Sequence, residues 1–186
     1  LDAELPRCGS GGGEAALVAA AFNRLPAFPD DPAIRFDFSF GIRAVIGLAP
    51  VDGQYEPGGK SAAPEGVSYL VLQGSLDADV GSFVGARAWE RVRVEGGDGA
   101  FKAGVFFERG SHAPFNTVWG RPDLGGLAGR FVAKGALLSE RDQQRIAAVH
   151  VSAFLDAALL GKRAYRALFR DDGAGAEGVA GGGEDA

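Results

Sequence analysis

Three short apolar runs, separated by segments typical of helices, constrain the fold of this chain most. The runs are IRAVIGLAP at residues 42–50, SYLVLQG at 68–74 and FKAGVFFE at 101–108. Runs of this kind, rich in β-branched and other apolar residues, form parallel strands that are buried on both faces. The alternation of strand and helix therefore predicts an α/β fold, mainly a parallel sheet flanked by helices.

Two of the flanking helices are expected, one before the first strand and one after the second. Residues 14–24 contain few helix breakers, and their alanines suit close packing against a sheet. Residues 79–92 read as a helix whose inward positions are Phe83, Ala86 and Trp89. Between the first helix and the first strand, LPAFPDDPA is expected to be a Pro-rich connection.

A third helix is predicted to begin after Ser139, which can cap it together with Asp142 three positions on. Gly161 supplies the stop, and YRALF beyond it is expected to add a last turn. The tail at 171–186 is low-complexity Gly, Ala and acid, and we expect it to be disordered. The apolar positions of the helix are Ile146, Val149, Ala153 and Ala157.

Size and charge narrow the classes of function. A chain of 186 residues is long enough for one α/β domain, and its net charge of −5 argues against nucleic acid or an anionic membrane as partner. No apolar run approaches the ~20 residues that a membrane span needs. The single cysteine, Cys8, excludes an intrachain disulfide, and a cytoplasmic location is only slightly favoured.

One serine, one aspartate and one histidine follow the expected elements in an informative order. Ser10 stands in a glycine run just before the first helix, Asp77 follows the second strand, and His112 follows the third. In an open parallel sheet, the loops at the carboxyl ends of strands converge. A hydroxyl, an imidazole and a carboxylate brought together there are the parts of a serine hydrolase, and the order Ser, acid, His is that of α/β-hydrolases.

Each residue also has a structural interpretation. Ser10 is compatible with an ordinary loop serine, and Asp77 with a cap of the following helix. Asp79 competes with Asp77 for either role, and His112 with a solvated loop residue. We assign the second histidine, His150, to packing within the last helix. The combination points to catalysis more strongly than any member alone.

These segments resemble the C-terminal half of an α/β-hydrolase, of the esterase and lipase kind found in actinobacteria; cutinase-like enzymes are more distant. CGSGGGEA is similar to the nucleophile elbow, with Ser10 as nucleophile. LVLQGSLDADV is similar to the acid strand, which selects Asp77, and ERGSHAPFNTVWG to the histidine loop, with His112 as general base. LAPVDGQYEPGG resembles the loop after the strand that follows the elbow helix. The likeness spans residues 10–169, so residues 1–170 are expected to be that half-domain.

The resemblance implies carboxylic ester hydrolysis through an acyl-enzyme, with a small-molecule ester as substrate. The backbone N–H of Gly11 would face the oxyanion, and no cofactor or metal is implied. Tyr55, Phe115 and Trp119 would line an acyl or alcohol site, although packing onto the core is an equal alternative.

The chain also departs from that family. Cys8 and Gly9 replace the usual elbow glycine and histidine, and Pro6 interrupts the approach strand. The N-terminal strands of the family fold are missing, which would remove the second oxyanion donor and cost about 10²–10³ in rate. We therefore expect impaired activity and an open sheet edge that could receive the missing half or a second copy of the chain.

Two other functions remain open at this stage. The chain could be a non-catalytic, hydrolase-like interaction module. The run GSGGGE could also bind a phosphate at the start of a helix, but it lacks the lysine of the Walker pattern and does not fit the dinucleotide fingerprint.

Overall fold

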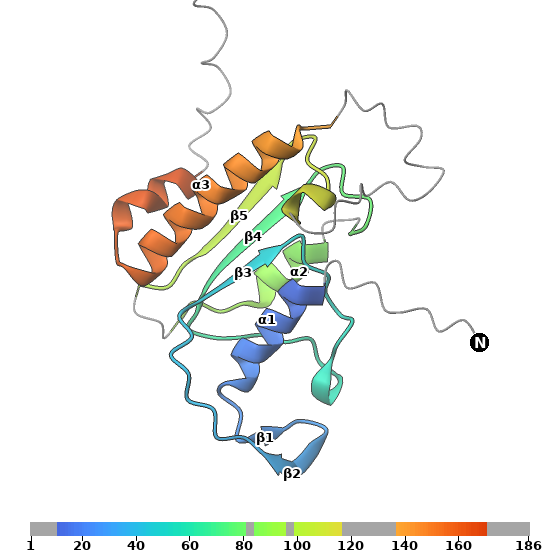
Figure 1. Ribbon diagram of the computed structural model, residues 1–186. Helices are drawn as coiled ribbons and strands as arrows, with labels where there is room; N and C mark the ends of the chain where they lie inside the picture. Colours follow the sequence, from blue (N-terminus) through green and yellow to red (C-terminus); the bar gives the residue numbers. More distant parts are fainter. Residues whose placement is uncertain (1–10, 81–83, 96–98, 117–136, 171–186) are drawn as a thin grey trace, which may run out of the picture.

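A computed structural model describes residues 11–80, 84–95, 99–116 and 137–170 (Figure 1). Its main sheet has three parallel strands in the order β3-β4-β5, with bounds Ala44–Leu48, Ser68–Gly74 and Lys102–Phe107. The mixed α/β architecture with a parallel sheet between helices confirms that part of the expectation. The strands coincide with the three apolar runs, and β4 has the bounds of its run.

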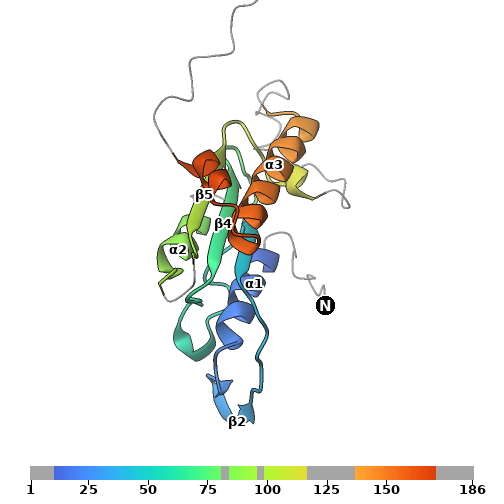
Figure 2. The same ribbon diagram turned by 90° about the vertical axis from the view of Figure 1, so that its left-hand side faces the viewer.

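Helices cover both faces of this sheet (Figures 1 and 2). On one face, α1 (Gly11–Phe22) and α2 (Val84–Arg91) pack against β3 and β4. On the other face lies α3 (Glu140–Leu159), followed by the 3₁₀ segment η5 (Arg163–Phe169), which corresponds to the expected last turn.

The central strand β4 divides its side chains between two cores. Tyr69 and Val71 join the cluster beneath α1 and α2, whereas Leu70 and Leu72 join the cluster beneath α3. All seven residues of β4 are buried. A strand without a solvent-facing side has no polar alternation, which is why residues 69–72 at its centre, YLVL, show none.

The ends of α3 follow from its sequence. The Ser139 hydroxyl caps the helix by accepting from the Asp142 N–H at 3.1 Å, and it donates to the Asp142 carboxylate at 2.6 Å. Gly161 has φ +68°, a left-handed conformation that glycine adopts at low cost, and the helix has ended just before it. Both predicted boundaries are confirmed.

Two expectations about inward faces are wrong in part. Ala86 of α2 is exposed, because Gly85 and Ala88 face the sheet instead. Trp89 packs against the core as expected, and Phe83 lies outside the described residues. On α3, Ile146 and Val149 are exposed, Val149 by 52%, although Ala153 and Ala157 are buried as expected. The helix is rotated so that the large ring of Phe154 is buried against the sheet; the residues that share this face are Gln143, Ala147, Val151 and Ala158.

A small antiparallel hairpin replaces the expected Pro-rich connection. It consists of β1 (Ala27–Phe28) and β2 (Asp31–Arg35), and it lies beyond the C-terminal end of α1 (Figure 1). A further 3₁₀ turn, η1 (Pro57–Gly59), lies in the long connection from β3 to β4. The predicted tail at 171–186 lies outside the described residues.

Among the glycines that open α1, Gly13 stands where a side chain would collide with the end of β3. A Cβ at Gly13 would lie 2.6 Å from the Cβ of Pro50, the buried proline after β3. At Gly12 the same atom would have nothing within 4 Å. Gly13 is therefore what lets α1 approach the end of β3.

Gly13→Ala should lower the free energy of unfolding by about 1–3 kcal/mol, because the rigid proline ring must move. Gly12→Ala should be neutral or stabilising by up to about 1 kcal/mol, since alanine is the better helix former. Urea unfolding of both variants measures this contrast. Equal effects at the two positions would contradict the proposed close approach.

The hydroxyl of Tyr69 has no hydrogen-bond partner within the described part of the chain, although the side chain is fully buried. Burial raises the pKa of this hydroxyl far above its usual value, and the nearby Asp52 carboxylate raises it further. The folded protein therefore holds this proton more tightly than the unfolded chain, and the associated stability is lost as the pH rises above about 10.

Tyr69→Phe should not destabilise the protein at neutral pH, and should stabilise it by about 1 kcal/mol, because an unsatisfied buried hydroxyl is removed. It should also remove part of the loss of stability above pH ~10. Thermal unfolding across pH, with the exposed Tyr165→Phe as control, tests both expectations. A loss of more than about 1 kcal/mol at neutral pH would mean that the hydroxyl has a partner.

Candidate functional site

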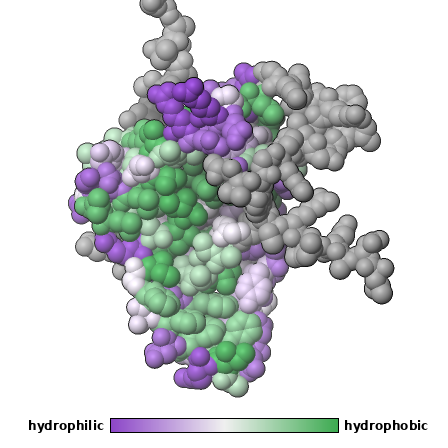
Figure 3. Space-filling model, in the orientation of Figure 1, coloured by the Kyte–Doolittle hydropathy of each residue, from purple (hydrophilic) through white to green (hydrophobic). Residues whose placement is uncertain are grey.

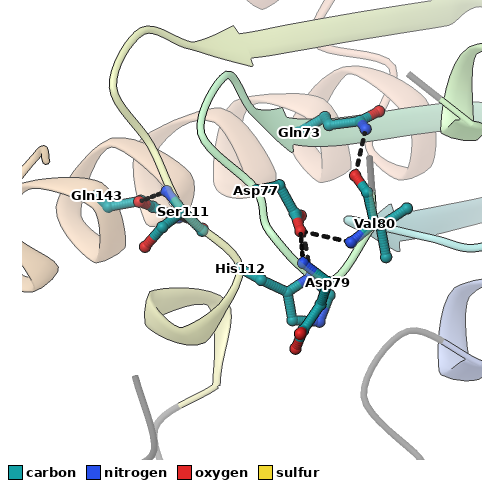
Figure 4. A network of polar contacts seen from close by, with 7 residues as sticks. All are labelled: Gln73, Asp77, Asp79, Val80, Ser111, His112 and Gln143. Carbon is teal, nitrogen blue, oxygen red and sulfur yellow. Dashed lines mark hydrogen bonds and ion pairs between the residues drawn. The ribbon is translucent and has the colours of Figure 1, made fainter. Parts of the chain in front are cut away.

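The loops that follow β3, β4 and β5 emerge at the same edge of the sheet, because the three strands are parallel. The first turn of α1 meets this edge through the contact of Gly13 with Pro50. Asp77 follows β4, and His112 follows β5. Figure 4 shows the two side chains directed toward each other across the gap between their loops.

Asp77 is held by its own turn and directed at the histidine. Its Oδ1 accepts from the backbone N–H groups of Val80 at 2.7 Å and Asp79 at 3.0 Å, and its Oδ2 lies 2.9 Å from Nδ1 of His112. Its side chain is only 1% exposed. Within the described residues, Asp77 makes no capping contact with α2, which begins at Val84; the backbone groups that it accepts from belong to its own turn.

Asp79, the competing acid, is exposed and contributes its backbone N–H to Asp77. The geometry thus distinguishes the two carboxylates: Asp77 contacts the imidazole, whereas Asp79 helps to fix Asp77. The resemblance had selected the same residue.

The contact with Asp77 defines which ring nitrogen of His112 carries the hydrogen. Its side chain is 9% exposed and it lies just before the 3₁₀ turn η2 (Ala113–Phe115). An ionised carboxylate can only accept a hydrogen bond, so the bond to Asp77 requires that Nδ1 carries the hydrogen. In the neutral ring, Nε2 is then the basic nitrogen. A buried Asp–His pair in this tautomer has the arrangement that the acid and the base of a catalytic triad require.

The loop that carries His112 is tied to the loop that carries Asp77. The Arg109 N–H donates to the Ser75 hydroxyl at 2.7 Å, and the Leu76 N–H donates to the Gly110 carbonyl at 2.8 Å. A Cβ at Gly74 would lie 2.4 Å from that carbonyl oxygen, so the two loops are in direct backbone contact. The Asp77–His112 pair therefore spans two segments that already touch.

A buried glutamine that was not expected from the sequence binds the histidine loop. Gln143 of α3 is 0% exposed, and its side chain makes two hydrogen bonds with the backbone of Ser111. Its carbonyl accepts from the Ser111 N–H at 3.0 Å, and its amide donates to the Ser111 carbonyl at 2.7 Å. The available signal was its position on the face of α3 that also carries Ala147 and Val151.

A second missed residue, Glu14, connects the first turn of α1 to the loop after β3. Glu14 is buried and accepts from the backbone N–H groups of Gln54 at 2.9 Å and Tyr55 at 3.3 Å. Gly11 is the first residue of α1, where backbone N–H groups have no partner in the preceding turn. Ser10, the residue before it, lies outside the described residues.

The same loop is held from its other side by an ion pair. Both carboxylate oxygens of Asp52 bind the guanidinium of Arg91 at the end of α2, one of them at 2.9 Å. These hydrogen bonds raise the pKa of the Arg91 guanidinium above its ordinary value. The loop is thus fixed to α1 and to α2, although its sequence is rich in turn-forming residues.

The three aromatic residues expected to line the substrate site have different outcomes. Tyr55 is 46% exposed at this edge of the sheet, next to the Glu14 contact. Phe115 is half-buried and packs edge-on against Phe107, with 5.3 Å between ring centroids, so it contributes to the core. Trp119 lies outside the described residues.

The second histidine takes part in packing, as expected. His150 Nδ1 donates to the Ile146 carbonyl at 2.8 Å, and its ring lies 5.9 Å from that of Phe169. The described residues contain no group of three or more His, Cys, Asp or Glu side chains arranged to hold a metal ion. Within the same residues, no helix is long and apolar enough to cross a membrane.

A surface cavity of about 580 Å³ lies at the opposite edge of the sheet, where β5 begins. Both acidic and basic side chains line this cavity. It lies at the end of the sheet where β5 begins, whereas Asp77 and His112 lie in loops at the other end, where β4 and β5 finish. Its lining residues are Ala63, Glu90, Arg91, Val92, Arg93, Val94, Glu95 and Lys102.

Comparison with known proteins adds no family to this geometry. No protein-family model matches the chain, and no curated protein matches its sequence. Any functional conclusion therefore depends on the residues themselves.

Asp77→Asn tests the tautomer of His112. The asparagine carbonyl can still accept from the turn, but its amide then faces Nδ1 and must donate to it. The hydrogen should therefore move to Nε2. Nitrogen NMR of the imidazole should show the Nδ1–H form in the original protein and the Nε2–H form in Asp77→Asn.

The matched control is Asp79→Asn, which should leave the imidazole spectrum unchanged. Asp77→Ala should lower the free energy of unfolding by about 1–3 kcal/mol, because the buried turn loses its acceptor. An unchanged tautomer in Asp77→Asn would contradict the geometry described for the pair.

Proposed function

We propose that the chain is a serine hydrolase that cleaves carboxylic esters, with Ser10 as nucleophile, His112 as general base and Asp77 as the orienting acid. The observation that carries this proposal is the buried 2.9 Å hydrogen bond between Asp77 and His112. This bond joins two loops at the carboxyl ends of parallel strands, the place where open parallel sheets bind their ligands.

The position of α1 supports Ser10 as the third member. Ser10 directly precedes the first residue of α1, and the first turn of that helix is fixed to the same edge of the sheet by Gly13 and Glu14. A serine just before a helix that packs on a parallel sheet has the position in the sequence that the nucleophile has in a strand-to-helix elbow.

The proposed reaction proceeds through an acyl-enzyme. His112 Nε2 takes the proton from the Ser10 hydroxyl as the serine oxygen bonds to the ester carbonyl carbon. The N–H of Gly11, at the positive end of α1, faces the developing oxyanion. The imidazolium returns the proton to the departing alcohol, and a water molecule, activated by the same imidazole, then releases the carboxylic acid. In this proposal Tyr55, which is exposed near the same edge of the sheet, contacts the acyl or alcohol group.

Besides a small-molecule ester, we propose a protein partner for the edge strand β3. Among the described strands, β3 has only one neighbour, and Ala44 and Ile46 are only partly buried. Figure 3 shows a broad hydrophobic area below the polar first turns of α3; the exposed apolar residues of β3 and α3 are Leu48, Ile146, Val149 and Leu159. We propose a second copy of the chain as the occupant of this edge.

Labelling with a fluorophosphonate, followed by mass-spectrometric mapping, tests the proposed chemistry. The label should attach to Ser10 and should be absent in Ser10→Ala. His112→Ala should slow labelling by at least about 100-fold, because the serine loses its general base. Ser61→Ala, which changes a surface serine outside the site, should label at the original rate.

Hydrolysis of short nitrophenyl esters should follow the same order among the variants. Labelling of another serine, or equal rates with and without His112, would overturn the proposed mechanism. A folded protein that does not label at all would favour the alternative, a non-catalytic interaction module.

A further inference from the structure

We propose that Gln143 is a positioning residue for His112, and that α3 thereby controls the alignment of the proposed general base. The inference deepens the proposed function and rests on it for its catalytic meaning. Its structural part, the control of the Asp77–His112 contact by Gln143, stands on separate observations.

The first observation is the chemistry of the contact. Gln143 pairs with both the N–H and the carbonyl of Ser111, at 3.0 and 2.7 Å. Two antiparallel hydrogen bonds to the same residue fix its position and its orientation. Because Ser111 directly precedes His112, they fix the point from which the imidazole side chain projects (Figure 4).

The second observation is the burial of every group in the contact. Counted over the whole residue, Gln143 is 0% exposed, Ser111 is 6% exposed and His112 is 7% exposed. Water cannot readily replace the glutamine amide in such surroundings, so its loss would leave two buried backbone groups unsatisfied. The loop would have to move to recover hydrogen bonds, and the imidazole would move with it.

The third observation is that the acid and the base are anchored differently. Asp77 is fixed by backbone groups of its own turn, at Asp79 and Val80. The histidine loop instead bonds to α3 through Gln143 and to Leu138, just before the Ser139 cap of that helix, since the Leu138 N–H donates to the Arg109 carbonyl at 2.8 Å. Arg109 has φ +60°, a conformation that costs energy in a non-glycine residue and persists where neighbours enforce it.

These contacts give Gln143 a role that general core packing does not supply. The start of α3 is secured by the Ser139 cap, so Gln143 is presented by a rigid element. An imidazole displaced by about 1 Å relative to its acid and nucleophile is expected to lose about 10–100-fold in rate. Gln143 does not belong to the reacting set; it acts through Ser111 and His112.

The test compares Gln143→Met with two control variants. Methionine keeps the length and much of the volume of glutamine but makes neither hydrogen bond. Gln144→Met makes the same substitution one residue later, where the amide donates to the exposed Glu140 of the same helix. Phe154→Leu perturbs the buried face of α3 in a different way, because Phe154 packs in the core beneath the helix.

The primary measurement is the Nδ1 proton of His112 in the hydrogen bond to Asp77, observed by proton NMR with its rate of exchange with solvent. In Gln143→Met this proton should exchange at least about tenfold faster, or its resonance should be lost. In Gln144→Met and Phe154→Leu it should be unchanged, even though Phe154→Leu lowers the melting temperature. Because this measurement needs no activity, it tests the control of the pair even if Ser10 is never labelled.

Fluorophosphonate labelling supplies the catalytic measurement. The rate at Ser10 should fall about 10–100-fold in Gln143→Met and by less than about twofold in the controls. With ester substrates the loss should appear in kcat with little change in KM, because the residue does not touch the substrate. An original protein that labels at Ser10 while Gln143→Met labels equally fast would overturn the positioning role.

An effect on exchange in Phe154→Leu equal to that in Gln143→Met would also overturn it, since general loosening of α3 would then account for the result. If Gln143→Met does not fold, Gln143→Glu provides the second variant. It keeps the acceptor for the Ser111 N–H and removes the donor, and it should raise the exchange rate of the His112 proton. Unchanged exchange in that variant would contradict the proposal.

Discussion

The burial of β4 on both faces is the constraint on which the rest of the structure depends. A strand with seven buried residues needs a layer of helices on each side, and α1 with α2 on one face and α3 on the other supply them. Its two neighbours run parallel to it, so their following loops end at the same edge. The meeting of Asp77 and His112 is thus a consequence of packing, since 35 residues separate them in the chain.

The parts of the fold that depend on local chemistry were predictable from the sequence. The β4 run is bounded by its own composition, and the Ser139 cap and Gly161 stop are local signals. The orientation of a helix about its own axis is different, because it is decided by the partner surface. The burial of Phe154 turns Ile146 and Val149 outward, and the apolar spacing alone does not distinguish these two faces. The β1–β2 hairpin escaped prediction because its prolines and aspartates are typical of loops.

In the candidate site, too, the features set by local sequence were predictable, and those set by contacts between distant segments were not. The sequence and the resemblance together selected Asp77 and His112, because each stands directly after an apolar strand. The residues that hold the surrounding loops gave no such signal. Gln143, Glu14 and Arg91 bind partners that lie 32, 40 and 39 residues away, and their role exists only after the helices have docked. Helical periodicity can place Gln143 on the inward face of α3, but no periodicity or motif predicts the partner of such a long-range polar contact.

This difference in anchoring has a consequence for the stability of the pair. The turn of Asp77 is closed by hydrogen bonds over two and three residues, so it needs little of the remaining fold. The position of His112 depends on β5, on the close approach of Gly110 to the loop after β4, and on α3 through Gln143. Segments of a protein open with different free energies, and opening is easiest where a contact spans separate elements. Undocking of α3 would therefore loosen the position of His112 while Asp77 keeps its local turn, which makes the Asp77–His112 contact sensitive to how well α3 is docked on the sheet.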